Sequence, residues 1–221
     1  MATIAFRDAT RPIPERVEDL LAQMTLDEKA GLMFHPPISM TPQGELIEEG
    51  EALSRGGATE LVAGRHLNHF NIYYAPEPRL HAEWHNRLQE VAAGTRLGIP
   101  VTISSDPRHS FEALGASWSA GGFSHWPEPI GLGATGDAEL VRRFADIARQ
   151  EYRAVGIHVA LHPMADLATE PRWARSMHTF GEDADLASRL VAAYVRGFQG
   201  DELGPHSVAC MTKHFPGGGP Q

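Results

Sequence analysis

Polar side chains follow three apolar runs of this sequence, at the points where those runs would end as strands. In chain order the groups are Ser104–Asp106, His162 with Asp166, and Lys213 with His214. In parallel α/β folds, functional groups gather at the C-terminal ends of strands. Carboxylates and cations that meet there can hydrogen-bond the hydroxyls of a neutral polyhydroxylated ligand with defined geometry. The sequence therefore predicts a binding site for such a ligand.

Each group also has a purely structural interpretation. Asp106 followed by Pro107 resembles a helix N-cap with proline in the first turn. The segment Pro171–Arg175 fits an arginine stacked on the neighbouring indole and paired with Glu182 or Asp183. The two cationic side chains after the last run are harder to explain in this way, because buried charges need partners.

The elements that would position these groups alternate between helices and strands. Apolar residues at helical spacing predict helices over 80–91, 139–155 and 186–198, with Gly156 and Gly200 after the last two. Short apolar or β-branched runs predict strands over 67–73, 101–104, 157–161 and 208–212. Near-continuous apolar strands separated by helices predict an α/β fold with a parallel sheet, either open and doubly wound or closed into a barrel. Periodicity does not separate these two.

Two more helices are expected near the start of the chain. The side chains that share one helical face after Pro14 are Val17, Leu20, Leu21 and Met24. Thr25 and Glu28 then form a capping box, the pattern that starts a second helix.

Bulk composition limits the partners. With 221 residues, of which 42% are hydrophobic, the chain can bury a core without a disulfide or a metal. Its 19 Lys and Arg against 28 Asp and Glu give a net charge of -9, so we expect neither nucleic acid nor a membrane as partner. The single Cys210 excludes an intrachain disulfide, and its apolar neighbours predict a buried thiol. Without a signal-like segment or an apolar stretch of ~20 residues, we expect a cytoplasmic protein.

Metal and cofactor motifs are weak. The 12 histidines include three candidate pairs, His66 with His69, His81 with His85, and His158 with His162. None has the spacing and acidic companion of a zinc motif, and neither a Gly-x-Gly-x-x-Gly turn nor a Gly-x-Ser-x-Gly elbow occurs. We predict no metal and no cofactor, while a metal-dependent barrel enzyme stays an alternative that rests on the histidine count.

Taken together, several segments resemble the N-terminal domain of glycoside hydrolase family 3, the β-glucosidase family, in the same order along the chain. They are Arg16–Leu21, Met24–Lys29, Gly98–Val101 leading to Asp106, Pro129–Leu132, Pro171–Arg175, Thr179–Asp183 and Lys213–Pro216. The resemblance covers nearly the whole chain apart from 35–79. It implies an α/β fold in which residues 1–221 form a partial (β/α)8 TIM-type barrel. A whole barrel takes roughly 250 residues, so we expect about its first half.

The same resemblance implies roles at the subsite for the non-reducing sugar. Asp106 would accept hydrogen bonds from sugar hydroxyls, and Arg175 would help to fix that carboxylate and the sugar. Lys213 and His214 would donate to other hydroxyls, and His109 would line the same pocket. Apart from the resemblance, the glycines Gly217–Gly219 make a backbone that can approach a ligand, or simply a flexible turn.

Glycoside hydrolysis also needs two nearby carboxyl groups. The resemblance implies a nucleophilic Asp and an acid/base downstream of Gln221, so we expect no catalytic residue here and an inactive 221-residue fragment. The implied activity of the longer protein is that of a retaining exo-acting β-glucosidase on a small β-glucoside or oligosaccharide. The alternatives are a non-catalytic carbohydrate-binding half-barrel, or a β-N-acetylglucosaminidase or β-xylosidase of the same family. Pro171–Arg175, which the N-acetylglucosaminidase branch typically lacks, favours β-glucosides. The sequence predicts no oligomeric state.

Overall fold

A parallel β-sheet forms the centre of the computed structural model, which describes residues 5–50, 56–110 and 122–214. Its strands are β1 (Pro37–Ile38), β2 (His69–Ile72), β3 (Thr102–Ser105), β4 (Ile157–Ala160) and β5 (Ala209–Cys210). They lie side by side in chain order, and every neighbouring pair is parallel.

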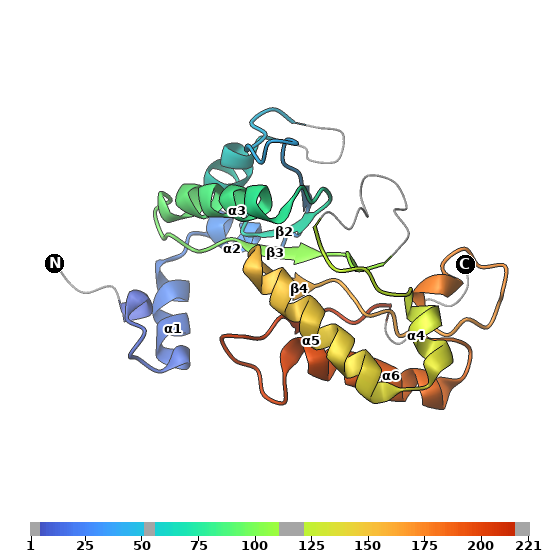
Figure 1. Ribbon diagram of the computed structural model, residues 1–221. Helices are drawn as coiled ribbons and strands as arrows, with labels where there is room; N and C mark the ends of the chain where they lie inside the picture. Colours follow the sequence, from blue (N-terminus) through green and yellow to red (C-terminus); the bar gives the residue numbers. More distant parts are fainter. Residues whose placement is uncertain (1–4, 51–55, 111–121, 215–221) are drawn as a thin grey trace.

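Helices connect and cover these strands (Figure 1). The α-helices are α1 (Ile13–Gln23), α2 (Leu26–Gly31), α3 (Pro78–Ala93), α4 (Pro129–Thr135), α5 (Ala138–Ala154) and α6 (Ala184–Gln199). Shorter turns are η1 (Ala5–Arg7), η2 (Glu60–Gly64) and η4 (Ser176–His178). None of the helices among the described residues is long and apolar enough to cross a bilayer.

The strand order decides between the two architectures that periodicity left open. A doubly wound sheet reverses its strand order at a switch point, whereas a (β/α)8 barrel adds each new parallel strand beside the last. Here the order β1-β2-β3-β4-β5 never reverses. The expectation of a partial (β/α)8 barrel is confirmed.

The two faces of the sheet differ in polarity. Phe70 pairs with Ile103 across β2 and β3, and the next pair along is Asn71 with Ser104. Because successive strand residues point to opposite faces, one face carries the apolar pair and the other the polar pair. The apolar pair belongs to a core shared with Trp84 of α3. The expectation of near-continuous apolar strands was therefore wrong for β2 and β3, whose second face bears hydrogen-bonding side chains.

Most of the local predictions are confirmed. Thr25 caps α2 through the expected capping box with Glu28. Gly156 and Gly200 have positive φ angles of 87° and 79°, directly beyond α5 and α6. These left-handed positions are the ones that only glycine occupies without strain.

Burial differs along the predicted apolar face of α1 and at Cys210. α1 forms as predicted, and its apolar face is only partly covered, with Val17 46% and Leu21 39% exposed while Met24 is buried. Cys210 is half-buried, not buried, because β5 lies at the end of the sheet where Ala209 and Met211 are exposed. Burial nevertheless raises the pKa of the Cys210 thiol to about 12.

Candidate functional site

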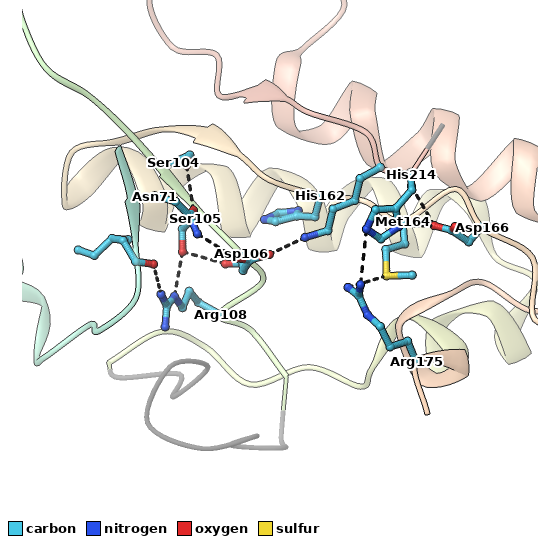
Figure 2. A network of polar contacts seen from close by, with 12 residues as sticks. Asn71, Ser104, Ser105, Asp106, Arg108, His162, Met164, Asp166, Arg175 and His214 are labelled. Atoms are coloured by element: carbon cyan, nitrogen blue, oxygen red, sulfur yellow. Dashed lines mark hydrogen bonds and ion pairs between the residues drawn. The ribbon is translucent and has the colours of Figure 1, made fainter. Parts of the chain in front are cut away.

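An ion pair between the ends of β3 and β5 forms the centre of the site (Figure 2). Lys213 Nζ lies 2.5 Å from Asp106 Oδ1, although the two residues are 107 positions apart in the chain. The backbone of Lys213 is fixed as well, since its N–H donates to the Pro163 carbonyl at 2.9 Å. Parallel strands thus deliver a carboxylate and an ammonium to one edge, as the sequence predicted.

The second oxygen of Asp106 is held from β2. Asn71 Nδ2 donates to Asp106 Oδ2 at 3.1 Å, and Asn71 Oδ1 accepts from Ser104 Oγ at 2.9 Å. Ser104 Oγ is also 2.7 Å from Nε2 of His35, just before β1. A chain of hydrogen bonds therefore crosses the polar face of the sheet to the carboxylate. Sequence reasoning missed Asn71, and the available signal was an amide within the apolar stretch 67–73.

Arg108 anchors the turn that carries Asp106. Its side chain is 1% exposed, and its guanidinium donates to the carbonyls of Ile72 at 2.6 Å and Tyr73 at 3.0 Å. Its Nε donates to Ser105 Oγ at 2.8 Å. Residues 106–109 are irregular, so Asp106 is not the N-cap of a helix that begins at Pro107. The guanidinium instead fastens this turn to the end of β2, a role that sequence reasoning did not assign.

A second acid–base pair lies beside the first. Asp166 Oδ2 accepts from the backbone N–H of His214 at 2.9 Å and lies 3.1 Å from His214 Nδ1. On the other side of the ring, Arg175 Nη1 is 3.5 Å from His214 Nε2. Arg175 Nη2 donates to the Met164 sulfur at 3.2 Å. No carboxylate within the described ranges pairs with Arg175, so most of its donors remain available.

Buried aromatic residues support the site from behind. The Tyr152 hydroxyl donates to the Asp106 carbonyl at 2.8 Å and lies 3.2 Å from His162 Nε2. The Tyr194 hydroxyl is 2.6 Å from His162 Nδ1. Burial, followed by the positive charge of Lys213, lowers the pKa of His162 well below its usual value. His162 is therefore neutral and structural, with both ring nitrogens hydrogen-bonded.

A small pocket opens beside these groups. Its lining residues come from the loops after β3, β4 and β5 and from α4, η4 and α6: Pro107, Ser110, Glu128, Pro129, His162, Pro163, Met164, Arg175, His178, Tyr194 and Lys213. Two peptide bonds at these strand ends, His162–Pro163 and Lys213–His214, are cis.

Two of the expected site residues make other contacts than predicted. Arg175 does not contact Asp106; Lys213 and Asn71 hold that carboxylate instead. His109 faces the core, where its Nε2 is 2.9 Å from Glu151 Oε2, and it is not among the residues that line the pocket. Burial lowers the pKa of His109, against the opposing effect of Glu151.

The purely structural interpretation of Pro171–Arg175 named other ion-pair partners than those observed. Arg172 pairs with Glu170 at 2.8 Å, whereas Glu182 and Asp183 had been expected as partners. The glycines Gly217–Gly219 and residues Phe215–Pro216 lie outside the described residues.

The histidine pairs do not form a metal site in the described part of the chain. No group of three or more His, Cys, Asp or Glu side chains there is arranged to hold an ion. The pair His158 and His162 is split, because His158 lies beside His85, with ring centroids 6.0 Å apart, while His162 bonds to the two tyrosines.

Comparison with known proteins relates this geometry to a family. The family model for the glycosyl hydrolase family 3 N terminal domain matches residues 60–221. A probable β-glucosidase C of Aspergillus flavus is 53% identical over 97% of the chain, and a periplasmic β-glucosidase/β-xylosidase of Dickeya chrysanthemi is 50% identical over 97%. The chain spans only 34% and 33% of these two proteins, about a third of their length.

A solved structure agrees with the sequence relatives. The β-glucosidase of Listeria innocua in complex with isofagomine matches 91% of this chain and 25% of its own, with a TM-score of 0.64 and 31% identity. The family model covers well over half of the sequence, and it includes β2 to β5 and every residue of the two acid–base pairs. The chain therefore belongs to glycosyl hydrolase family 3, of which it carries the N-terminal domain sequence.

Proposed function

We propose that this chain supplies the sugar-binding part of a retaining exo-acting β-glucosidase. The observation that supports this most is the Asp106–Lys213 pair, joined across the ends of β3 and β5 at 2.5 Å. Both side chains keep some exposed surface, 12% for Asp106 and 17% for Lys213. A hydroxyl of a bound sugar can donate to the carboxylate while another accepts from the ammonium. Such charge-assisted hydrogen bonds are about twice as strong as neutral ones.

The neighbouring groups extend the same chemistry. Arg175 offers unused N–H donors, and the half-exposed His214 ring lies next to it. Opposite charges with fixed positions suit a neutral polyol better than an ionic ligand, whose net charge one of the two groups would repel. The relatives named β-glucosidase support a β-glucoside as substrate.

We propose that the two carboxyl groups that break the glycosidic bond are not among the described residues. Retaining glycosidases need a nucleophile and an acid/base about 5–5.5 Å apart. In the described residues, Asp106 is engaged by Lys213 and Asn71, and Asp166 by His214. We assign both carboxylates to binding and positioning, and we place the nucleophile and the acid/base downstream of Gln221.

Binding is tested by removing one charge and keeping the shape. Asp106→Asn in the complete gene product removes the negative charge that Lys213, Asn71 and a sugar hydroxyl contact, and a hydrogen bond to a charged group is worth about 1.5–3 kcal/mol. We expect kcat/KM on a chromogenic β-glucoside to fall about 10- to 100-fold. Asp201→Asn, on an exposed turn, is the matched control and should be unchanged. Equal activity of both variants would contradict the assignment.

A β-xyloside is the second candidate substrate, because one relative is named β-glucosidase/β-xylosidase. Assaying the same enzyme on β-glucoside, β-xyloside and N-acetyl-β-glucosaminide separates these activities by kcat/KM. Glucose binding without turnover of any of them would instead favour the non-catalytic half-barrel. The cytoplasmic location stays a prediction, which fractionation of the native host would test.

A further inference from the structure

The His214 ring lies between two partners of opposite hydrogen-bonding type (Figure 2). Asp166 faces Nδ1 at 3.1 Å with a side chain that has no exposed surface, while the His214 side chain is 43% exposed. The same carboxylate oxygen accepts from the His214 backbone N–H at 2.9 Å. The buried carboxylate therefore fixes both the backbone and the ring of one residue.

These partners determine where the ring carries its proton. A carboxylate only accepts hydrogen bonds, so Nδ1 must present a hydrogen to Asp166. A guanidinium only donates, so Nε2, 3.5 Å from Arg175 Nη1, must present a lone pair. A second proton on Nε2 would place two cations against each other. The contacts on the two nitrogens agree on one form, the neutral ring protonated at Nδ1.

We propose that Asp166 is a positioning residue that fixes His214 in the neutral Nδ1–H form, so that Nε2 acts as a hydrogen-bond acceptor at the rim of the site. This reverses the donor role that the family resemblance suggested for His214. The next step rests on the proposed function. If the ligand is a sugar, the hydroxyl that contacts Nε2 must donate its hydrogen to that nitrogen.

Arg175 further restricts which ligand group can bind at His214 Nε2. Arg175 Nη1 and His214 Nε2 are 3.5 Å apart, which is long for a hydrogen bond. A ligand group could therefore replace this contact with a shorter hydrogen bond to each nitrogen. A hydroxyl that lies beside them, within hydrogen-bonding distance of both atoms, accepts from Arg175 and donates to His214 at the same time. An ether or a carbonyl oxygen can only accept, so it would leave the imidazole lone pair unsatisfied. The arrangement therefore selects a free hydroxyl at this position.

The proton position is measured by 15N NMR of the complete gene product labelled at histidine side chains. The His214 signals are identified by their loss in His214→Gln. Without ligand, we expect Nδ1 to show the shift of a protonated, pyrrole-type nitrogen and Nε2 that of an unprotonated, pyridine-type nitrogen. A pyridine-type Nδ1 with a protonated Nε2 would overturn the proposal, whether or not any variant folds.

Removing the carboxylate tests the cause. In Asp166→Ala we expect the Nε2–H form to gain population, because Nδ1 has lost its acceptor. Asp201→Ala, which removes an exposed carboxylate elsewhere, should leave the spectrum unchanged. An unaltered Nδ1–H form in folded Asp166→Ala would refute the role of Asp166.

Titration with glucose separates this inference from the proposed function. If both hold, the unprotonated Nε2 signal moves on binding and stays of the pyridine type, since it accepts a hydrogen bond. If Nε2 becomes protonated in the complex, the acceptor role is wrong. If the tautomer is as proposed but glucose moves no His214 signal, the positioning role stands and the sugar-binding proposal fails.

Discussion

Tyr194→Phe removes one hydroxyl from behind the site and changes little else. That hydroxyl is 2.6 Å from His162 Nδ1, and His162 is 1% exposed, so the vacated nitrogen is buried. The Tyr152 hydroxyl already donates to the Asp106 carbonyl, so it acts as acceptor toward His162 Nε2. The ring nitrogen next to Tyr194 must then be the acceptor, and the variant leaves it buried without a partner.

The expected cost follows from that unsatisfied acceptor. A buried polar group without a partner costs about 1–3 kcal/mol. With a urea slope of about 2 kcal/mol per molar, a loss of about 2 kcal/mol lowers the unfolding midpoint by about 1 M. Tryptophan fluorescence of the complete gene product follows the transition that involves this domain.

Tyr74→Phe provides the matched control. Tyr74 also packs against the core, but its hydroxyl has no hydrogen-bond partner among the described residues. We expect its free energy of unfolding to stay within about 0.5 kcal/mol of the wild type. If the two variants unfolded at the same urea concentration, the buried tyrosine–histidine network would contribute nothing and the reasoning would be refuted.

Three further outcomes follow from packing, titration and strand pairing. Gly197→Ala would place a Cβ 2.4 Å from the Ala145 Cβ, between α5 and α6. We therefore expect urea unfolding to show a free energy of unfolding that is lower by about 1–3 kcal/mol. The control Gly204→Ala should be neutral, because no atom lies within 4 Å of the added Cβ. Burial lowers the pKa of His81 to about 3, and neither ring nitrogen has a partner in the described structure. Since the unfolded ring binds a proton below pH 6.5 and the folded ring does not, His81 alone should lower the free energy of unfolding by about 2 kcal/mol between pH 6.5 and 5, and urea unfolding of His81→Leu should lose that much less than the wild type over this pH range. The 221-residue chain expressed alone exposes the outer edges of β1 and β5, so we expect it to associate in analytical ultracentrifugation. We also expect no turnover of a β-glucoside. An active monomer would contradict both expectations.

The sequence predicted the parts of the site that follow strand ends. Asp106 and Lys213 both come directly after apolar runs. Because parallel strands place their C-terminal ends at one edge, the two side chains could be expected to lie close together although they are 107 positions apart in the chain. Strands β2 to β5 and the helices α1, α3, α5 and α6 were recognisable from periodicity or apolar runs, whereas β1 and α4 were not predicted. Which parallel architecture they form was not, since an open sheet and a barrel share that periodicity; the unreversed strand order resolved it.

Side chains on irregular segments were less predictable. His109 and Arg175 lie outside strands, where no periodicity indicates which way a side chain points. His109 turns inward, where Glu151 of α5 provides a partly buried partner, a contact between distant segments. Arg108 was assigned no role from the sequence, because its role depends on carbonyls at the end of β2 that the sequence does not place.

A crystal structure of the complete gene product with bound glucose tests the central claim most directly. We predict one sugar ring whose hydroxyls contact Asp106, Lys213, His214 and Arg175 within hydrogen-bonding distance, with an additional carboxylate from downstream of Gln221 near the anomeric carbon. Glucose bound away from the ends of β3 and β5, with the Asp106–Lys213 pair untouched, would contradict the account.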